Sequence, residues 1–204
     1  GIHRYDQHRL KRFGREDPEN REEFRAELQD MVETLYNCPC IGVWTPFNES
    51  WGQFHAIRIA EWIKTLDPTR LVDHASGWFD QGGGDFQSRH VYVKPLSARI
   101  PDDRILAVTE FGGYTMQVPN HVYTDRERFG YGHYQDAESL TAAYLNLLEQ
   151  QVKPLIPKGL CAAIYTQTSD IETEINGFLS YDRKVEKMDP QILRKAHQEL
   201  IESL

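Results

Sequence analysis

Two short apolar runs in this chain each end in a glutamate. Residues 41–47 lead into Asn48 and Glu49, and residues 105–109 lead into Glu110. A short apolar run bounded by turn residues predicts a buried strand of a parallel sheet. Ligands bind at the carboxyl ends of such strands, so we expect both carboxylates to face one pocket.

Aromatic residues and glycines surround both glutamates in the sequence. Trp44 and Trp51 flank Glu49, and residues 111–114, Phe-Gly-Gly-Tyr, follow Glu110. A glutamate after a strand is often a solvated loop residue, but such loops are usually rich in lysine and serine. Aromatic faces stack on sugar rings, and glycines let the backbone approach a ligand closely. Paired carboxylates in this setting indicate cleavage of a glycosidic bond.

Strand-like and helix-like patterns alternate along the rest of the chain. Apolar runs predict strands at residues 40–45, 71–74, 88–93, 105–109 and 160–165. Spacings of three and four residues predict helices at 22–36, with Asn20 as its cap, and at 54–66, 138–155 and 190–204. Residues 1–20, 76–85 and 112–137 are expected to be irregular. The alternation predicts a parallel α/β architecture.

Composition limits the classes of partner. The chain has 204 residues, 40% hydrophobic and 26% charged, which suits one globular domain. A net charge of −8 argues against nucleic acid and anionic membranes as partners. No run approaches the roughly 18 apolar residues of a membrane helix. No signal peptide is visible at Gly1, so the compartment stays open: cytoplasmic, or periplasmic or secreted if the full-length protein carries one.

Neither a metal nor a cofactor is expected. Cys38, Cys40 and Cys161 are an odd number of cysteines and are interpreted as buried thiols. No histidine or cysteine cluster supplies the fourth ligand of a zinc site. Acidic residues at 170, 172 and 174 could bind a cation, but a solvated acidic loop is the favoured interpretation.

Two segments resemble known catalytic motifs. Residues 45–53, Thr-Pro-Phe-Asn-Glu-Ser-Trp-Gly-Gln, and residues 108–114, Val-Thr-Glu-Phe-Gly-Gly-Tyr, resemble the two signatures of glycoside hydrolase family 2. That family contains β-galactosidases, β-glucuronidases and β-mannosidases. The resemblance extends from about residue 22 to about residue 183, and it implies a (β/α)8 TIM barrel with the motifs at the ends of strands four and seven.

The resemblance also implies which part of the barrel is present. The five predicted strands correspond to strands four to eight, so residues 1–204 form part of a single catalytic barrel domain. Strands one to three and the preceding β-sandwich domains are absent from the chain, since a whole barrel takes about 250 residues. Open strand edges favour self-association as a homo-oligomer, and we expect little or no activity from the isolated chain.

The resemblance assigns roles to both glutamates. It implies a retaining, exo-acting β-glycosidase with Glu49 as acid/base and Glu110 as the nucleophile that forms a covalent glycosyl-enzyme. Retention implies carboxyl groups about 5–5.5 Å apart. A β-galactoside is the first expectation for the substrate. Asn48 is implied to bind the sugar 2-hydroxyl, and an ordinary turn asparagine is the alternative.

Further residues are candidates for the sugar pocket. His90 and Tyr92 resemble a His-x-Tyr segment on strand six of the family, where such groups line the pocket. His74 ends the preceding strand, and a structural histidine is the competing interpretation. Trp78 is either an aromatic platform or a loop anchor. Gln53 is either a helix cap or a group behind the site.

The last strand departs from the family pattern. Many members carry a tryptophan at the end of strand eight, whereas here Tyr165 or Gln167 must take that place. This leaves the sugar open. Two other functions compete: a carbohydrate-binding domain or inactive fragment with the same aromatic cleft, and an endo-acting glycanase of the same clan. The segments after Glu110 and after residue 166 favour family 2, with a carbohydrate as the partner.

Overall fold

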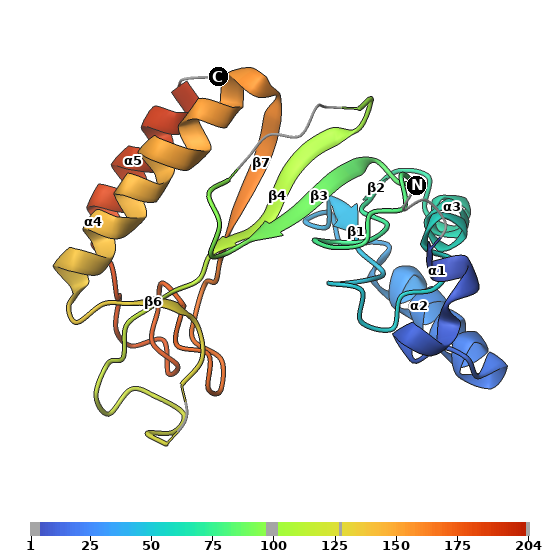
Figure 1. Cartoon of the computed structure of the whole chain (residues 1–204), viewed down its shortest axis with the longest axis horizontal. Coiled ribbons are helices and arrows are strands. Elements are labelled where there is room, and N and C mark those ends of the chain that lie inside the picture. The colour runs from blue at the N-terminus through green and yellow to red at the C-terminus, as the bar shows by residue number, and fades with distance from the viewer. Residues whose placement is uncertain (1–4, 97–101, 127, 203–204) are drawn as a thin grey trace. The chain divides into compact units, whose positions relative to one another are not determined.

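The computed structural model describes residues 5–96, 102–126 and 128–202 (Figure 1). The chain divides into two compact units, the first of residues 1–90 and 100–109 and the second of residues 91–99 and 110–204. The division passes through β3 (Phe86–Val91) after His90 and through β4 (Ile105–Gly112) after Thr109. Among the described residues, no helix has the length and apolar character needed to cross a bilayer.

The first unit contains the N-terminal elements and the first parts of β3 and β4. The N-terminal elements are α1 (Tyr5–His8), the 3-10 helix η1 (Leu10–Phe13), α2 (Pro18–Leu35), β1 (Val43–Trp44), α3 (Ala56–Leu66) and β2 (Leu71–Val72). The helix α2 begins at Pro18, whose fixed φ suits the first helical position. Asp17 caps it by accepting a hydrogen bond from the Glu19 N–H at 2.9 Å. The prediction that Asn20 is the cap is therefore wrong; its amide oxygen instead accepts from Arg15.

A parallel backbone pairing organises the first unit. It starts where Val43 and Trp44 of β1 pair with Leu71 and Val72 of β2. It continues beyond both strands, because the Ser76 N–H donates to the Phe47 carbonyl at 2.9 Å and the Glu49 N–H donates to the Ser76 carbonyl at 2.9 Å. The predicted strands at 40–45 and 71–74 are thus present as short strands whose pairing extends to Glu49.

An aromatic cluster fixes the segment that leads to Glu49. Phe47 is buried and stacks on Phe24 of α2, with ring centroids 5.1 Å apart. Phe54 is fully buried and meets both rings edge-on at 5.4 and 5.6 Å. Such pairs contribute about 0.5–1.5 kcal/mol beyond the burial of their area. The chain on either side of residues 48–53 is therefore anchored in the core of the first unit.

A buried carboxylate joins three parts of the first unit. Asp67 follows α3 and accepts hydrogen bonds from Trp44 Nε1 at 2.9 Å and from Arg70 Nη1 at 2.6 Å. Arg70 in turn donates to the carbonyls of Tyr36 and Ile41, in the segment between α2 and β1. Asp67 therefore connects the end of α3 to β1 and to the chain after α2.

The second unit contains the remaining elements. They are the ends of β3 and β4, then β5 (Tyr114–Thr115), β6 (Tyr131–His133), α4 (Ala137–Leu147), the π-helix η2 (Leu148–Val152), the 3-10 helix η3 (Lys153–Lys158), β7 (Leu160–Thr166) and α5 (Pro190–Glu202). Strands β3, β4 and β7 form one sheet in that order, and β5 pairs with β6 in parallel. Helices α4 and α5 lie side by side (Figure 1).

All five predicted strands and all four predicted helices are present, with changed limits. The predicted helix at 138–155 is α-helical only to Leu147, and it continues as the π-helix η2 and the 3-10 helix η3, which contains Pro154 and Pro157. The helix at 190–204 is confirmed as α5, and its residues 203–204 lie outside the described residues. Residues predicted as irregular contain α1, η1, β5 and β6. The described strands form sheets of two, three and two strands, without closing a barrel.

The prediction of three buried thiols is wrong. Cys40 and Cys161 are exposed and Cys38 is partly exposed. Cys161 lies on β7, where residues 161, 163 and 164 are all exposed, so an apolar run did not imply burial here. Cys38 and Cys40 lie in the turn between α2 and β1.

The Asp67 network generates a stability prediction. Asp67→Ala removes the acceptor of Trp44 Nε1 and the carboxylate that pairs with the Arg70 charge, and we expect a loss of about 3–5 kcal/mol in the free energy of unfolding. Urea unfolding of the chain measures it. Asp30→Ala, on the exposed face of α2, is the matched control and should change stability by less than about 0.5 kcal/mol. Equal effects of the two substitutions would contradict the account.

Candidate active site

Glu49 lies on a loop with an unusual backbone. Glu49, Ser50 and Gly52 all have positive φ angles, of 52°, 69° and 62°. Positive φ is uncommon for residues other than glycine, costs about 1–3 kcal/mol and is concentrated at functional sites. Arg15 holds the loop by donating from Nε to the Gly52 carbonyl at 2.8 Å. The Glu49 side chain is 19% exposed, so its carboxyl group is accessible from a constrained position.

His90 joins the Glu49 carboxylate to Ser76. His90 Nδ1 lies 2.7 Å from Glu49 Oε1, and His90 Nε2 lies 2.7 Å from Ser76 Oγ. The imidazole side chain is completely buried. In a neutral imidazole one nitrogen donates and the other accepts, whereas a hydroxyl does both. The pair therefore has two arrangements: Nδ1–H donates to an ionised Glu49, or a protonated Glu49 donates to Nδ1 while Nε2–H donates to Ser76.

Neighbouring groups fix the imidazole in place. A side chain at Gly77 would put its Cβ only 2.5 Å from His90 Cγ, and Gly77 has φ +84°, so this position requires glycine. Ser76 Oγ lies 3.4 Å from Thr109 Oγ1, which lies 2.6 Å from Ser88 Oγ. The Gly77 N–H donates to Ser88 Oγ at 3.3 Å. A connected set of hydroxyl groups thus supports the side of His90 that faces away from Glu49.

Glu110 has a different partner, in the second unit. The Tyr92 hydroxyl donates a hydrogen bond to its carboxylate. The Tyr92 ring stacks on Tyr131, with centroids 4.5 Å apart and planes 20° apart. A Cβ at Gly113 would lie 2.8 Å from the Tyr131 ring and 3.1 Å from the Tyr92 ring, so the pair is tightly packed. Tyr92 is therefore held in the orientation that reaches Glu110.

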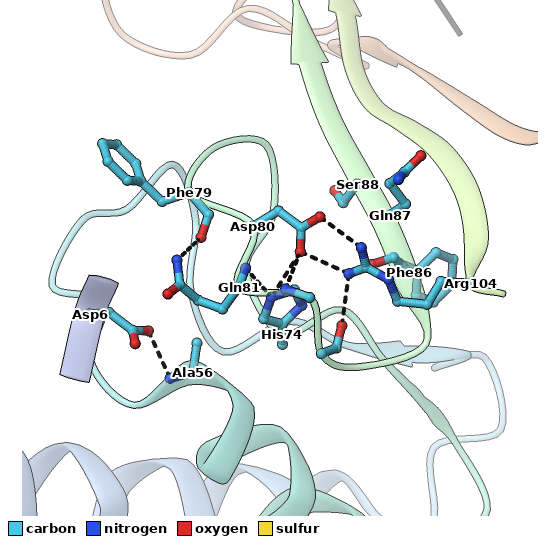
Figure 2. Close-up of polar contacts among 12 residues, drawn as sticks. Asp6, Ala56, His74, Phe79, Asp80, Gln81, Phe86, Gln87, Ser88 and Arg104 are labelled. Carbon is cyan, nitrogen blue, oxygen red and sulfur yellow. Dashed lines mark hydrogen bonds and ion pairs between the residues drawn. The ribbon is translucent and has the colours of Figure 1, made fainter. Parts of the chain in front are cut away.

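His74 belongs to a buried cluster in the first unit (Figure 2). Its Nε2 accepts from the Gln81 N–H at 3.0 Å and lies 3.3 Å from Asp80 Oδ1. Asp80 also accepts two hydrogen bonds from Arg104, at 2.8 and 2.7 Å. Burial would raise the pKa of the Asp80 carboxyl, but the hydrogen bonds from the Arg104 guanidinium and from the Gly82 N–H outweigh it and hold that pKa well below its usual range. His74 thus matches the structural interpretation.

Asn48 and Trp78 are more open to solvent. Asn48 is exposed, and its backbone forms a parallel bridge to Ser76. Trp78 is 46% exposed and lines a pocket of about 380 Å³ that Glu49 also lines. We call this the Glu49 pocket; its lining residues are Arg12, Phe13, Gly14, Glu49, Ser50, Trp51, Gly52, Trp78 and Phe79. Gln53 is buried instead, and its amide donates to Asp6 at 3.1 Å.

Tyr165 and Gln167 have partners inside the second unit. The Tyr165 ring stacks on Phe178 at 4.6 Å, its hydroxyl accepts from the Tyr114 N–H at 3.0 Å, and burial raises its pKa. The Gln167 amide donates to Asn176 Oδ1 at 2.8 Å. Thr166, between them, lies with Oγ1 3.4 Å from the Tyr92 hydroxyl. Successive strand side chains point to opposite faces, so Thr166 reaches Tyr92 where its neighbours do not.

The acidic segment after β7 is tied down by a lysine. Asp170 Oδ1 accepts from Lys187 Nζ at 2.7 Å and from the Gly177 N–H at 2.8 Å, and both charged side chains are completely buried. Within either unit, no three described histidine, cysteine or acidic side chains lie close enough to share a metal ion. The expectation that the protein uses no metal or cofactor stays a prediction.

Comparison with known proteins supports the family resemblance over most of the chain. The family model described as glycosyl hydrolases family 2, TIM barrel domain, matches residues 6–166. A β-galactosidase of Klebsiella pneumoniae is 33% identical over 90 residues, which are 44% of this chain and 8% of that protein. The chain therefore spans only a small part of the length of this curated relative.

Solved structures share the fold. An FMN-binding β-glucuronidase from Faecalibacterium prausnitzii L2-6 superposes with a TM-score of 0.59 at 17% identity, over 84% of this chain and 31% of that one. A β-glucuronidase from an uncultured Clostridium sp. gives a TM-score of 0.58 at 11% identity, over 89% of this chain and 36% of that one. With the family match, this likeness confirms the predicted fold class: the chain is part of a TIM barrel.

The contact between Ser76 and His90 generates the second prediction. Ser76→Ala removes the partner of a buried ring nitrogen, so the free energy of unfolding should fall by about 1–3 kcal/mol. The ring nitrogen NMR signals of His90 should also shift, because its tautomer is no longer set from the Nε2 side. Ser88→Ala, which removes a hydroxyl of the same network without touching His90, should leave those signals nearly unchanged. Unaltered His90 signals in Ser76→Ala would contradict the assignment.

Asp80 generates a prediction about pH. Its folded-state pKa lies below the unfolded value of about 3.9, so its contribution is complete above that value and is lost as the pH falls through the folded-state pKa. Asp80→Asn should lower the free energy of unfolding at pH 7 by about 1.5–3 kcal/mol. Urea unfolding at decreasing pH should show this difference shrinking below about pH 4. The exposed control Asp103→Asn should show little change, and a pH-independent difference for Asp80→Asn would contradict the prediction.

Proposed function

This chain belongs to glycosyl hydrolase family 2, as part of its TIM-barrel domain, and we propose that the protein containing it hydrolyses terminal β-linked sugars with retention of configuration. One observation carries the assignment of roles: Glu110 has a partner that donates, and Glu49 has a partner that can either donate or accept. Tyr92 donates a proton in its hydrogen bond to Glu110, which suits a carboxylate that attacks as an anion. His90 can either donate to Glu49 or accept from it, which suits a group that gives and takes a proton.

The proposed reaction has two steps. The Glu110 carboxylate attacks the anomeric carbon, the glycosidic C–O bond breaks, and Glu49 gives its proton to the departing oxygen. The product is a covalent glycosyl-enzyme with Glu49 ionised. Glu49 then takes a proton from water, the water oxygen attacks the anomeric carbon, and the bond to Glu110 breaks. Both carboxyl groups return to their starting states.

The surrounding residues support this division of labour. Both ring nitrogens of His90 are engaged, one by Glu49 and one by Ser76, so we assign His90 to positioning Glu49 rather than to direct sugar contact. Asn48 is exposed next to Glu49 and is proposed to bind the sugar 2-hydroxyl. Thr166, which adjoins Tyr92, is proposed to stand nearer the sugar than Tyr165 or Gln167.

A β-galactoside is the proposed substrate. The support is the curated relative from Klebsiella pneumoniae, which is a β-galactosidase at 33% identity over the matched segment. The β-glucuronidase structures, at 17% and 11% identity, bear on the fold alone. A panel of nitrophenyl glycosides that share one leaving group, assayed with the full-length protein, identifies the sugar directly.

The role assignment predicts two different mutant phenotypes in the full-length protein. Glu110→Gln should abolish formation of the glycosyl-enzyme for every substrate, because an amide is a poor nucleophile. Glu49→Ala should cost about 10²–10⁴-fold for substrates with poor leaving groups and much less for activated aryl glycosides, which need little protonation. Rates for a series of leaving groups of decreasing acidity measure the difference. Equal losses on all leaving groups for both variants would show that the roles are assigned wrongly.

A further inference from the structure

Two exposed tryptophans line the Glu49 pocket. Trp51 is 79% exposed and Trp78 is 46% exposed, although tryptophan is on average a strongly buried residue. The pocket volume of about 380 Å³ lies near the lower end of the range of about 300–1,000 Å³ found for small-molecule sites. Exposed aromatic rings gathered at a pocket of this size indicate a site for a flat, partly apolar group.

The wall that carries Trp51 is anchored to the core. Arg15 donates to the Gly52 carbonyl, and its guanidinium lies over the rings of Phe24 and Phe54 at 4.8 and 5.7 Å. The Arg15 contact thus helps to hold Glu49, Ser50 and Gly52 in their left-handed backbone conformation. In this loop the Trp51 side chain is exposed to solvent. Holding an apolar ring in water is unfavourable unless a ligand or partner covers it.

The wall that carries Trp78 is anchored as well. The Trp78 N–H donates to the Ser76 carbonyl at 3.1 Å, and Asp80, two residues on, is bound by Arg104 and His74. Figure 2 shows the Phe79 ring pointing away from this cluster. That ring, which also lines the pocket, packs edge-on against Phe13 at 5.5 Å. Both walls are therefore formed before a ligand arrives, which lowers the entropy lost on binding.

We propose that the Glu49 pocket binds the leaving-group part of the substrate, as a ring whose apolar faces contact both Trp51 and Trp78. The inference rests on the proposed role of Glu49. An acid that protonates the glycosidic oxygen must lie next to the group attached to that oxygen. Glu49 lines the pocket, whereas Asn48, which is proposed to bind the sugar, and His90, which is proposed to position Glu49, do not. The pocket therefore adjoins the proposed acid and is separate from these two residues.

The chemistry of the ring is shared by two kinds of leaving group. A pyranose presents an apolar face of C–H groups, and an aryl group presents a π-face, and each can stack on an indole. A disaccharide and an aryl glycoside with the same sugar therefore distinguish the two sources. A glycosyl fluoride of that sugar has no ring in its leaving group and serves as the reference substrate.

Kinetics of the full-length protein test the proposal. Trp51→Ala and Trp78→Ala should each reduce kcat/KM by about tenfold for a substrate with a ring in its leaving group, the size of one aromatic contact. Hydrolysis of the glycosyl fluoride should be unchanged. Trp51→Phe and Trp78→Phe retain a flat ring and should restore most of the loss. Tyr123→Ala removes an exposed aromatic ring outside the pocket and is the matched control.

Each result has a defined meaning. Loss for the disaccharide alone assigns a pyranose, loss for the aryl glycoside alone assigns an aryl group, and loss for both supports the shared chemistry. An equal loss on the fluoride, or no loss on any substrate, overturns the inference while the proposed hydrolysis stands.

Binding separates failure of this inference from failure of the proposed function. If the wild-type protein hydrolyses no glycoside, the function has failed. Titration of the Glu110→Gln variant with the disaccharide and with the methyl glycoside of the same sugar then tests the pocket alone. Trp51→Ala in that background should weaken disaccharide binding about tenfold and leave methyl glycoside binding unchanged. Equal affinities for the disaccharide with and without Trp51 would overturn the inference.

Discussion

The parallel pairing that runs from Val43 and Leu71 to Glu49 and Ser76 supports everything else in the first unit's site. Through it, the Ser76 carbonyl fixes the Glu49 backbone while the Ser76 hydroxyl reaches the imidazole that contacts the Glu49 carboxylate. One serine thus holds both ends of the Glu49–His90 pair. The positive φ of Glu49 is sustained by this pairing on one side and by Arg15 at Gly52 on the other.

Two adjacent residues of strand β4, Thr109 and Glu110, lie in different surroundings. Thr109 joins the hydroxyl groups behind His90, and Glu110, the next residue, accepts from Tyr92. Adjacent residues of a strand point to opposite faces, so one step along the chain changes the surroundings from serine and threonine hydroxyls to stacked tyrosines. The two proposed catalytic carboxylates therefore differ in their partners because of the side chains that surround each one, rather than through any difference in residue type.

The sequence predicted the features that arise locally. Apolar runs ending in Asn48–Glu49 and Glu110 identified the strands, and helical spacing identified α2, α3, α4 and α5. The sequence could not predict the long-range contacts. Nothing in its pattern shows that Ser76 contacts His90, or that Gly77 packs closely against the imidazole ring. The partial burial of Tyr165 and the exposure of Cys161 depend on which face of β7 is covered, and an apolar run does not reveal that. Thr166 could have been found by strand alternation from Tyr165.

The Ser76 hydroxyl can either donate a hydrogen bond to His90 Nε2 or accept one from it. This matters for the proposed acid, because Glu49 has to lose a proton and regain it during the reaction. In a retaining cycle Glu49 is protonated before the first step and ionised before the second. Beside an ionised Glu49, Nδ1–H donates to the carboxylate and Ser76 donates to Nε2, and beside a protonated Glu49 the Ser76 oxygen accepts from Nε2–H, so both ring nitrogens keep a hydrogen-bond partner in either state. No heavy atom of the buried group has to move. The two protonation states of the proposed acid thus share one arrangement of heavy atoms around His90, and they differ only in where the hydrogens lie.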